Sequence, residues 1–142
     1  MINILAVEND RQKSSVIYSA LSDRSRYHLA IVDSGYTAIE AIGLKKFDLI
    51  IIERDLSFLS GLKTARSLRK RLSDNISPFV IIGDGFEEQE AEDFISTGVF
   101  DFWEPPLSIQ RIRLTAESVA NGWRSPNDNL KNFGEYLERL GR

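Results

Sequence analysis

Five short apolar runs alternate with five amphipathic segments along most of the chain. The runs are nearly continuous in Ile, Val, Leu and Phe, which is typical of parallel strands covered on both faces. They span Ile2–Val7, Leu29–Val32, Asp48–Ile52, Phe79–Ile82 and Val99–Trp103. The segments between them repeat apolar residues at helical spacing. This alternation predicts βαβ units with right-handed crossovers, and hence an α/β fold with a doubly wound parallel sheet.

Length and composition favour one ordinary globular domain. The chain has 142 residues, 42% of them hydrophobic and 27% charged, which is enough to bury a core. It has no cysteine, which excludes disulfides and a cysteine nucleophile, and its net charge of −3 argues against a generally basic nucleic-acid surface. No apolar run approaches the roughly 20 residues of a membrane span, and the N-terminus lacks a leader pattern. We therefore expect a cytoplasmic protein.

The regular alternation ends near Asn121, which divides the chain into a domain over residues 1–121 and a C-terminal extension over 122–142. In the extension, Ser125 suits a helix N-cap and Pro126 suits the first helical position. An apolar stripe then follows at helical spacing, made of Leu130, Phe133, Leu137 and Leu140. We expect a sixth helix that lies outside the five-unit core.

In a doubly wound sheet, chemistry takes place beyond the carboxyl ends of the strands. Two carboxylates occupy such positions, because Glu8 follows the first apolar run and Glu53 follows the third. Asn9 comes directly after Glu8, Gly83 ends the fourth run, and Pro105 follows the fifth. The expected site therefore combines two acids with an amide, a glycine and a proline.

The run Asp48-Leu-Ile-Ile-Ile-Glu53, followed by Gly61, resembles the third strand of a response-regulator receiver domain. The resemblance covers Ile2 to about Val119. It implies a flavodoxin-like five-stranded sheet of order 2-1-3-4-5, here with an extra C-terminal helix. In that family the strand ends on the aspartate that accepts phosphate from a histidine kinase. Glu53 takes its place in this chain.

The other family positions also differ. Receivers hold Mg²⁺ with an acidic pair after the first strand, where this chain has Glu8 and Asn9. They carry a hydroxyl at the position of Gly83 and a lysine at the position of Pro105. Pro106 matches the proline that follows this lysine through a cis bond. Phe102 matches the aromatic switch position, whose triggering hydroxyl is absent.

These departures predict a degenerate, pseudo-receiver site. A carboxylate displaced by about 1 Å can slow in-line transfer on the order of 100-fold, so phosphorylation of Glu53 is not expected. Asp55 belongs to the following loop and should point away. A permanent charge on Glu53 could mimic phosphoaspartate, but both residue types that sense it are missing. We expect a signalling domain that acts by protein–protein interaction without aspartyl phosphorylation and is not an enzyme.

Other uses of the site remain open. Glu8 and Glu53 could hold a divalent metal such as Mg²⁺ and keep the receiver switchable. A small molecule could instead bind in the cleft that Gly83 and Gly85 would open. An acid/base pair of Glu8 and Glu53 has no supporting motif. Apart from Mg²⁺ in the first alternative, no cofactor is predicted.

A signalling or regulatory protein is the expected partner. A homodimer could form through the fourth and fifth helices or the C-terminal helix, and nucleic acid would be bound only by an output domain outside this chain. No membrane contact is expected, and the single histidine, His28, suits a surface or packing role. The candidate interaction surface comprises Trp103, Arg111, Arg113, Leu130, Phe133, Leu137 and Leu140.

Overall fold

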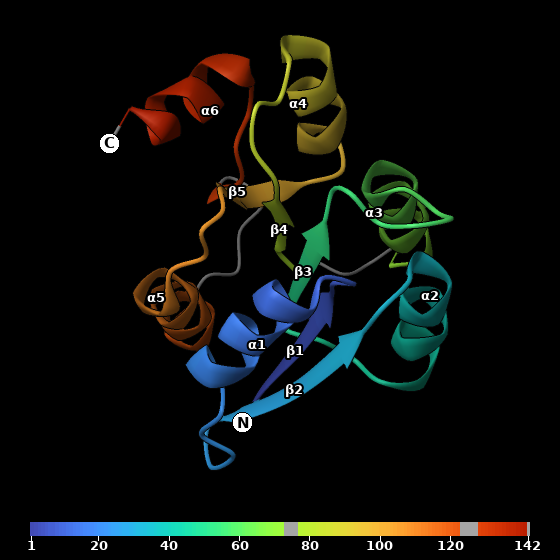
Figure 1. The fold of residues 1–142 in the computed structure, drawn as a ribbon, viewed down its shortest axis with the longest axis vertical. Helices are drawn as coiled ribbons and strands as arrows, with labels where there is room; N and C mark the ends of the chain where they lie inside the picture. Colours follow the sequence, from blue (N-terminus) through green and yellow to red (C-terminus); the bar gives the residue numbers. More distant parts are fainter. Residues whose placement is uncertain (73–76, 123–127, 142) are drawn as a thin grey trace.

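A five-stranded parallel sheet forms the centre of the molecule (Figure 1). The computed structural model describes residues 1–72, 77–122 and 128–141. Its strand order is β2-β1-β3-β4-β5, which confirms the predicted flavodoxin-like topology. The strands are β1 (Ile2–Val7), β2 (Tyr27–Val32), β3 (Leu49–Glu53), β4 (Phe79–Ile82) and β5 (Val99–Trp103).

Six helices surround the sheet in the described ranges. They are α1 (Arg11–Ala20), α2 (Gly35–Leu44), α3 (Gly61–Arg71), α4 (Glu88–Ile95), α5 (Ile109–Ala120) and α6 (Phe133–Leu140). Side-chain oxygens of Asp10, Ser34, Ser60 and Ser108 each accept a backbone N–H at the start of their helix, which fixes where α1, α2, α3 and α5 begin. None of the helices described is long and apolar enough to cross a membrane.

The two faces of the sheet bury separate cores. Helices α1 and α5 cover one face, and α2, α3 and α4 cover the other (Figure 1). Alternate residues of β3 serve the two cores, Ile50 and Ile52 one of them and Leu49 and Ile51 the other. This double coverage explains why the strands are continuously apolar. The central strands therefore hold their carboxyl ends at one common edge.

The C-terminal helix is part of the second core, which corrects the expectation that it lies outside. Helix α6 begins after its N-cap Asn132, and the start predicted at Ser125 and Pro126 falls outside the described residues. Its Tyr136 is 1% exposed, with its ring centroid 4.8 Å from that of Phe102. The division of the chain at residue 121 remains a prediction.

Polar contacts also fasten the last segment to α4 and β5. The backbone N–H of Leu130 donates to the Val99 carbonyl at 2.8 Å, and that of Phe133 donates to Glu92 at 3.0 Å. Arg139 donates to Asp101 at 2.9 Å. The segment from Leu130 to Leu140 thus covers the side of the molecule formed by α4 and β5 (Figure 1).

Replacing Tyr136 with alanine is expected to lower the free energy of unfolding by about 3 kcal/mol, because it leaves a cavity among aromatic rings. Urea unfolding of the variant measures this loss. Glu138→Ala is the matched control, since Glu138 is exposed on the same helix and its loss should change stability by less than about 0.5 kcal/mol. Equal losses in the two variants would contradict the packing of α6.

Candidate functional site

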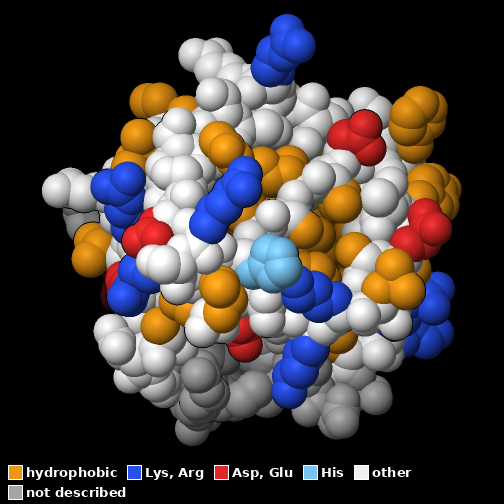
Figure 2. Space-filling view, turned by 90° about the horizontal axis from the view of Figure 1, so that it is seen from below, with side chains coloured by type: hydrophobic (Ala, Val, Ile, Leu, Met, Phe, Trp, Pro, Cys, Tyr) orange, Lys and Arg blue, Asp and Glu red, His pale blue; other side chains and the backbone are white. Residues whose placement is uncertain are grey.

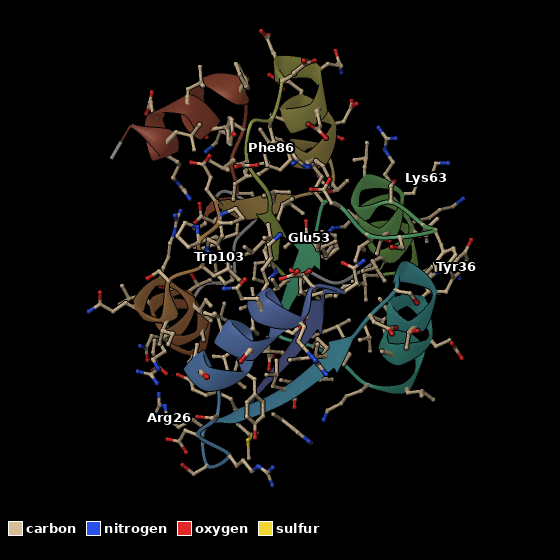
Figure 3. All side chains as sticks on the ribbon, viewed as in Figure 1. Arg26, Tyr36, Glu53, Lys63, Phe86 and Trp103 are labelled. Atoms are coloured by element: carbon tan, nitrogen blue, oxygen red, sulfur yellow. The ribbon has the colours of Figure 1, made fainter. Side chains whose placement is uncertain are left out.

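Two buried carboxyl groups lie side by side at the carboxyl edge of the sheet. Val7 pairs with Ile52 in the parallel ladder, so Glu8 and Glu53 leave adjacent strands at the same level. Glu8 is 2% exposed and Glu53 1% exposed. Figure 3 shows Glu53 near the centre of the molecule, at the end of β3. The structure therefore brings together the two acids that the sequence singled out.

Gly61 holds the loop after β3 close to the strand end. A Cβ atom on Gly61 would lie 2.3 Å from the Glu53 carbonyl oxygen and 2.6 Å from the Arg54 Cα. Both contacts are with backbone, which cannot move aside as a flexible side chain can. Any larger residue would therefore push α3 away from the strand that carries Glu53.

The counter-charge of Glu53 is Lys13, which the sequence analysis missed. Lys13 Nζ lies 2.8 Å from Glu53 Oε1, and the backbone N–H of Asp55 donates to Oε2 at 2.8 Å. The N-cap Asp10 accepts the Lys13 N–H at 2.9 Å and so sets the rotation of α1. Side chains of a helix lean toward its N-terminus, which directs Lys13 back over the strand ends. Both oxygens of Glu53 already accept hydrogen bonds.

Glu8 behaves as a neutral acid at neutral pH. Burial raises its pKa to about 8 from an ordinary value of 4.5, and a hydrogen bond with Glu53 acts in the same direction. Its Oε2 accepts the Asp10 N–H at 3.1 Å, while Oε1 receives no hydrogen bond in the described structure. When it is protonated, Glu8 can donate a hydrogen bond to Glu53. With Lys13 positive and Glu53 negative, the cluster is then uncharged.

These residues do not fit a resident Mg²⁺ ion. Mg²⁺ prefers oxygen ligands in octahedral geometry, usually with one or two carboxylates. Here the Lys13 ammonium already contacts Glu53, and Glu8 Oε2 already accepts the Asp10 N–H at 3.1 Å. Asn9 is exposed, and its amide donates to the Ser57 hydroxyl at 3.2 Å. The described part of the chain holds no group of three or more His, Cys, Asp or Glu side chains suited to a metal.

The space beside Gly83 is filled, which corrects the expectation of a widened cleft. A Cβ atom there would lie 2.9 Å from the Phe86 ring and 3.3 Å from the Arg54 Cβ. The Arg54 guanidinium in turn lies 4.7 Å from the centre of the Phe86 ring. Phe86 therefore occupies the position next to the missing hydroxyl. A serine at residue 83 would need this ring to shift.

The other residues that match family positions contribute to backbone geometry and packing. The peptide bond between Pro105 and Pro106 is cis, as the resemblance implied for Pro106. Phe102 is 2% exposed and packs 4.9 Å from Phe86, ring centre to ring centre. The side chain of Asp55 is 67% exposed and pairs with Arg54, so it points away from the site as expected.

Several residues assigned to an interaction surface lie inside the fold. Trp103 is 2% exposed and Leu130 4% exposed, and Phe133 is half-buried against the core. Trp103 packs under α5, because its side chain belongs to the apolar core on that face of the sheet. The prediction of an exposed role is therefore wrong for Trp103 and Leu130.

The other residues of that predicted surface remain accessible to different degrees. Arg111 donates to Asp101 at 2.8 Å, and Arg113 donates to the Ala20 carbonyl at 3.0 Å. Leu137 is 48% exposed and Leu140 38% exposed. Asp101 joins α5 and α6 through Arg111 and Arg139. Sequence reasoning missed this link, because the position of α6 against β5 depends on contacts far away in the chain.

The sequence that forms these strands and helices matches a known family. The family model of the response regulator receiver domain matches residues 4–117. The chain belongs to this family. As a receiver domain, it departs from the pattern stated above at Asn9, Glu53, Gly83 and Pro105.

Relatives of this receiver domain are longer proteins. Transcriptional regulatory protein ZraR of Escherichia coli K12 is 26% identical over 118 residues, which span 83% of this chain and 26% of that protein. Autoinducer 2 sensor kinase/phosphatase LuxQ of Vibrio cholerae is 26% identical over 129 residues, or 91% of this chain and 15% of that protein. The chain thus spans about a quarter or less of these relatives.

Solved structures share the fold of this receiver domain. Chemotaxis protein CheY4 of Vibrio cholerae superposes with a TM-score of 0.75 at 17% identity, covering 84% of this chain and 98% of CheY4. A two-component response regulator from Clostridium difficile gives a TM-score of 0.75 at 20% identity, covering 88% of this chain and all of that one. At these identities the likeness concerns the fold alone.

Proposed function

We propose that this receiver domain regulates a signalling partner by protein–protein contact and without phosphorylation at Glu53. The observation that carries the proposal is the ion pair between Lys13 and Glu53, 2.8 Å long and buried on the acid side. A receiver normally leaves its acceptor free to attack phosphorus and adds its cation after the fifth strand. Here the cation comes from α1 and already neutralises the acid.

The chemistry of phosphoryl transfer supports the same conclusion. Catalysis of this step is mostly positioning and charge stabilisation around the three phosphoryl oxygens. Both oxygens of Glu53 accept hydrogen bonds, and Gly83 and Pro105 supply neither a hydroxyl nor an ammonium. An incoming phosphoryl group would also have to displace Lys13, which would leave that cation beside a neutral Glu8. The site therefore lacks the groups that would activate the acceptor, and it also lacks the residues that sense a bound phosphoryl group in this family.

Two helices offer surface for a partner or a second copy. Ile109 and Leu114 of α5 are 40% and 67% exposed, and Leu137 and Leu140 of α6 are also accessible. The fully buried core of a protein interface is more apolar than the rest of the protein surface. The side formed by α4 and β5 is covered by α6, so a partner on this half of the molecule would contact α5 and the outer side of α6.

Incubation with acetyl phosphate and Mg²⁺, followed by intact mass spectrometry, tests the proposal. The wild-type chain is expected to gain no phosphoryl group. The matched control carries Asn9→Asp, Lys13→Met, Glu53→Asp and Pro105→Lys, which restore the acidic pair, the aspartate and the family's lysine and remove the competing cation. This variant should gain phosphate, which shows that the assay detects the product.

A phosphoryl group found on Glu53 or Asp55 of the wild-type chain would refute the proposal. A titration with Mg²⁺ alone tests the metal-dependent alternative. We expect the amide resonances of residues 8, 53 and 83 to stay in place. Shifts clustered at these residues would show that a divalent ion displaces Lys13.

A further inference from the structure

Strand β2 forms an open edge of the sheet. It is the first strand in the order β2-β1-β3-β4-β5 and pairs with β1 alone. Ile2 N–H donates to the Arg26 carbonyl and Glu8 N–H donates to the Val32 carbonyl, so the even-numbered residues of β2 face β1. Backbone groups alternate in direction along a strand. The N–H and C=O groups of Leu29 and Ile31 therefore point outward from the sheet.

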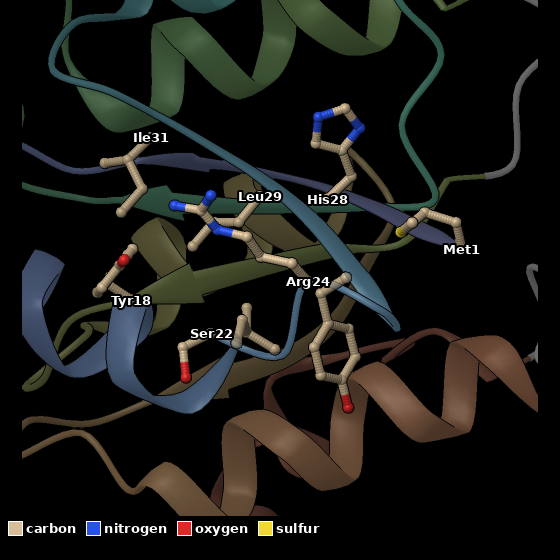
Figure 4. A pocket seen from close by; sticks show the side chains of 9 residues that line it. Met1, Tyr18, Ser22, Arg24, His28, Leu29 and Ile31 are labelled. Atoms are coloured by element: carbon tan, nitrogen blue, oxygen red, sulfur yellow. The ribbon is translucent and has the colours of Figure 1, made fainter.

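A groove runs along this edge on the α1 side. Its volume is about 560 Å³, and it is lined by Met1, Tyr18, Leu21, Ser22, Arg24, Tyr27, His28, Leu29 and Ile31. Figure 4 shows Tyr18 and Ser22 on the α1 side of β2 and His28 on the opposite side. Tyr18 is 54% exposed and Ile31 36% exposed, although both are apolar over most of their surface. The groove offers apolar contacts directly beside unpaired backbone groups.

Basic side chains lie on both sides of the edge strand. Its nine lining residues include an arginine and a histidine but no carboxylate. Lys45, at the C-cap of α2, lies with its Nζ 2.7 Å from His28 Nδ1, so two basic side chains meet on the outer side of β2. The Arg24 side chain extends along β2 toward Ile31 in Figure 4. Figure 2 shows His28 among Lys and Arg side chains with apolar surface between them.

No salt bridge of the described structure neutralises Arg24 or Lys45. The ion pairs found there involve other cations, such as Arg26 with Glu117. Two acids lie nearby. Asp23 accepts a hydrogen bond from the Ser25 hydroxyl, and Asp33 follows the carboxyl end of β2. The excess of positive charge is thus greatest around the first half of the strand.

We propose that β2 binds an extended acidic segment of a partner protein, which adds to the sheet as a sixth strand. The outward groups of Leu29 and Ile31 would hydrogen-bond the incoming backbone, as in strand addition to other sheet edges. Alternate side chains point to opposite faces of a strand. Apolar residues of the segment would enter the groove, and the acidic residues between them would face His28 and Lys45, with Arg24 at the end.

An acidic segment matches this edge better than a second copy of this chain does. Two β2 strands paired across a two-fold axis run antiparallel, so the end with Arg24 in one chain would face the end with Asp33 in the other. A second copy would therefore offer one acid at each end of the pair and none opposite the middle of the strand. An acidic partner instead gains from contact with Arg24, His28 and Lys45. The surface lies apart from Glu53, so the inference does not depend on the phosphorylation state of the site.

Two peptides serve as probes, acetyl-(Glu-Val)₃-Glu-amide and its counterpart with lysine in place of glutamate. Titrated into the ¹⁵N-labelled full chain, the acidic peptide is expected to shift the amide resonances of residues 24 and 28–31. It should also slow hydrogen exchange at the amides of Leu29 and Ile31. The lysine peptide should cause neither change, because only the charge of the probe differs.

Charge reversal on the protein gives the second test. Arg24→Glu and Lys45→Glu should each weaken binding of the acidic peptide about tenfold, which corresponds to removing one exposed attraction and adding one repulsion. Lys70→Glu makes the same charge change on the exposed part of α3 and should leave the affinity unchanged. Ile31→Pro, which removes an outward N–H without breaking the ladder to β1, should also weaken binding.

Three results would overturn the inference. They are equal binding of both peptides, shifts that lie away from β2, and an equal loss of affinity in Lys70→Glu. Sedimentation at rising protein concentration adds a fourth outcome. A dimer whose resonances change at residues 28–31 would identify a second copy as the occupant and refute the acidic partner.

Discussion

Replacing Lys13 with methionine is expected to lower the free energy of unfolding by about 3–5 kcal/mol at neutral pH. The variant keeps most of the length of the side chain but removes its charge, and Glu53 then lies 1% exposed with no cation beside it. A buried charge without a partner is among the costliest changes in a folded protein. Urea unfolding at neutral pH, followed by circular dichroism, measures the loss.

Two comparisons separate this effect from a general loss of helix α1. Arg11→Met removes a positive charge from the exposed first position of the same helix and should change stability by less than about 0.5 kcal/mol. The loss in Lys13→Met should also shrink at acidic pH, because a protonated carboxyl needs no cation. A loss that is equal in both variants, or independent of pH, would show that Lys13 does not neutralise Glu53.

Glu8 is expected to make the domain less stable as the pH rises. Its pKa is about 8 in the folded chain and 4.5 in its ordinary state, so the folded protein holds a proton there that the unfolded chain releases. The contribution is fully present below pH 4.5 and is lost as the pH rises through about 8. Within this window the slope is about 1.4 kcal/mol per pH unit, or a few kcal/mol in total.

Glu8→Gln should remove this slope. Glutamine stays neutral at every pH and can still donate a hydrogen bond to Glu53. The free energy of unfolding of the variant, relative to that of the wild type, should therefore rise by a few kcal/mol between about pH 5 and 8. Unfolding curves at several pH values give the difference. Glu40→Gln, on the exposed side of α2, is the control, and its stability should change with pH as that of the wild type does. The same pH dependence in Glu8→Gln would contradict the protonated state of Glu8.

The architecture could be predicted from the sequence because its signal is local and redundant. Each strand is an apolar run between glycine-rich or polar turns, and each helix carries its own periodicity. Once the sheet is known to be parallel and its strand order is known, the positions of both acids follow, since Glu8 comes directly after β1 and Glu53 ends β3. Boundaries were less exact: β2 begins at Tyr27, two residues earlier than expected, and β3 includes Glu53.

The pairing of Lys13 could not be predicted in the same way. A lysine in the first turn of a helix has the same sequence signal whether it faces water or a buried acid. Which way it faces depends on the rotation of α1, and the Asp10 cap and the packing of Ile17 set that rotation together. Pro105 occupies the usual place of the family's cation, and nothing local in the sequence links the loss of that cation to Lys13.

The C-terminal helix shows a second limit. A stripe of Leu130, Phe133, Leu137 and Leu140 fits helical spacing, yet Leu130 precedes the helix and Leu137 is exposed. Tyr136 is the buried residue, and its ring packs 4.8 Å from that of Phe102, centroid to centroid. The segment also contacts Asp101 and Glu92, which lie far away in the sequence.

Because α6 is covalently attached to the surface that it covers, any protein that targets α4 and β5 competes with an intramolecular ligand. A tethered segment acts as if present at a concentration on the order of millimolar. A free competitor at micromolar concentration would therefore need roughly a thousandfold advantage in intrinsic affinity to displace it. Weak, transient binders are thereby excluded from this surface, and only partners that contact other surfaces, or that bind α6 itself, avoid the competition.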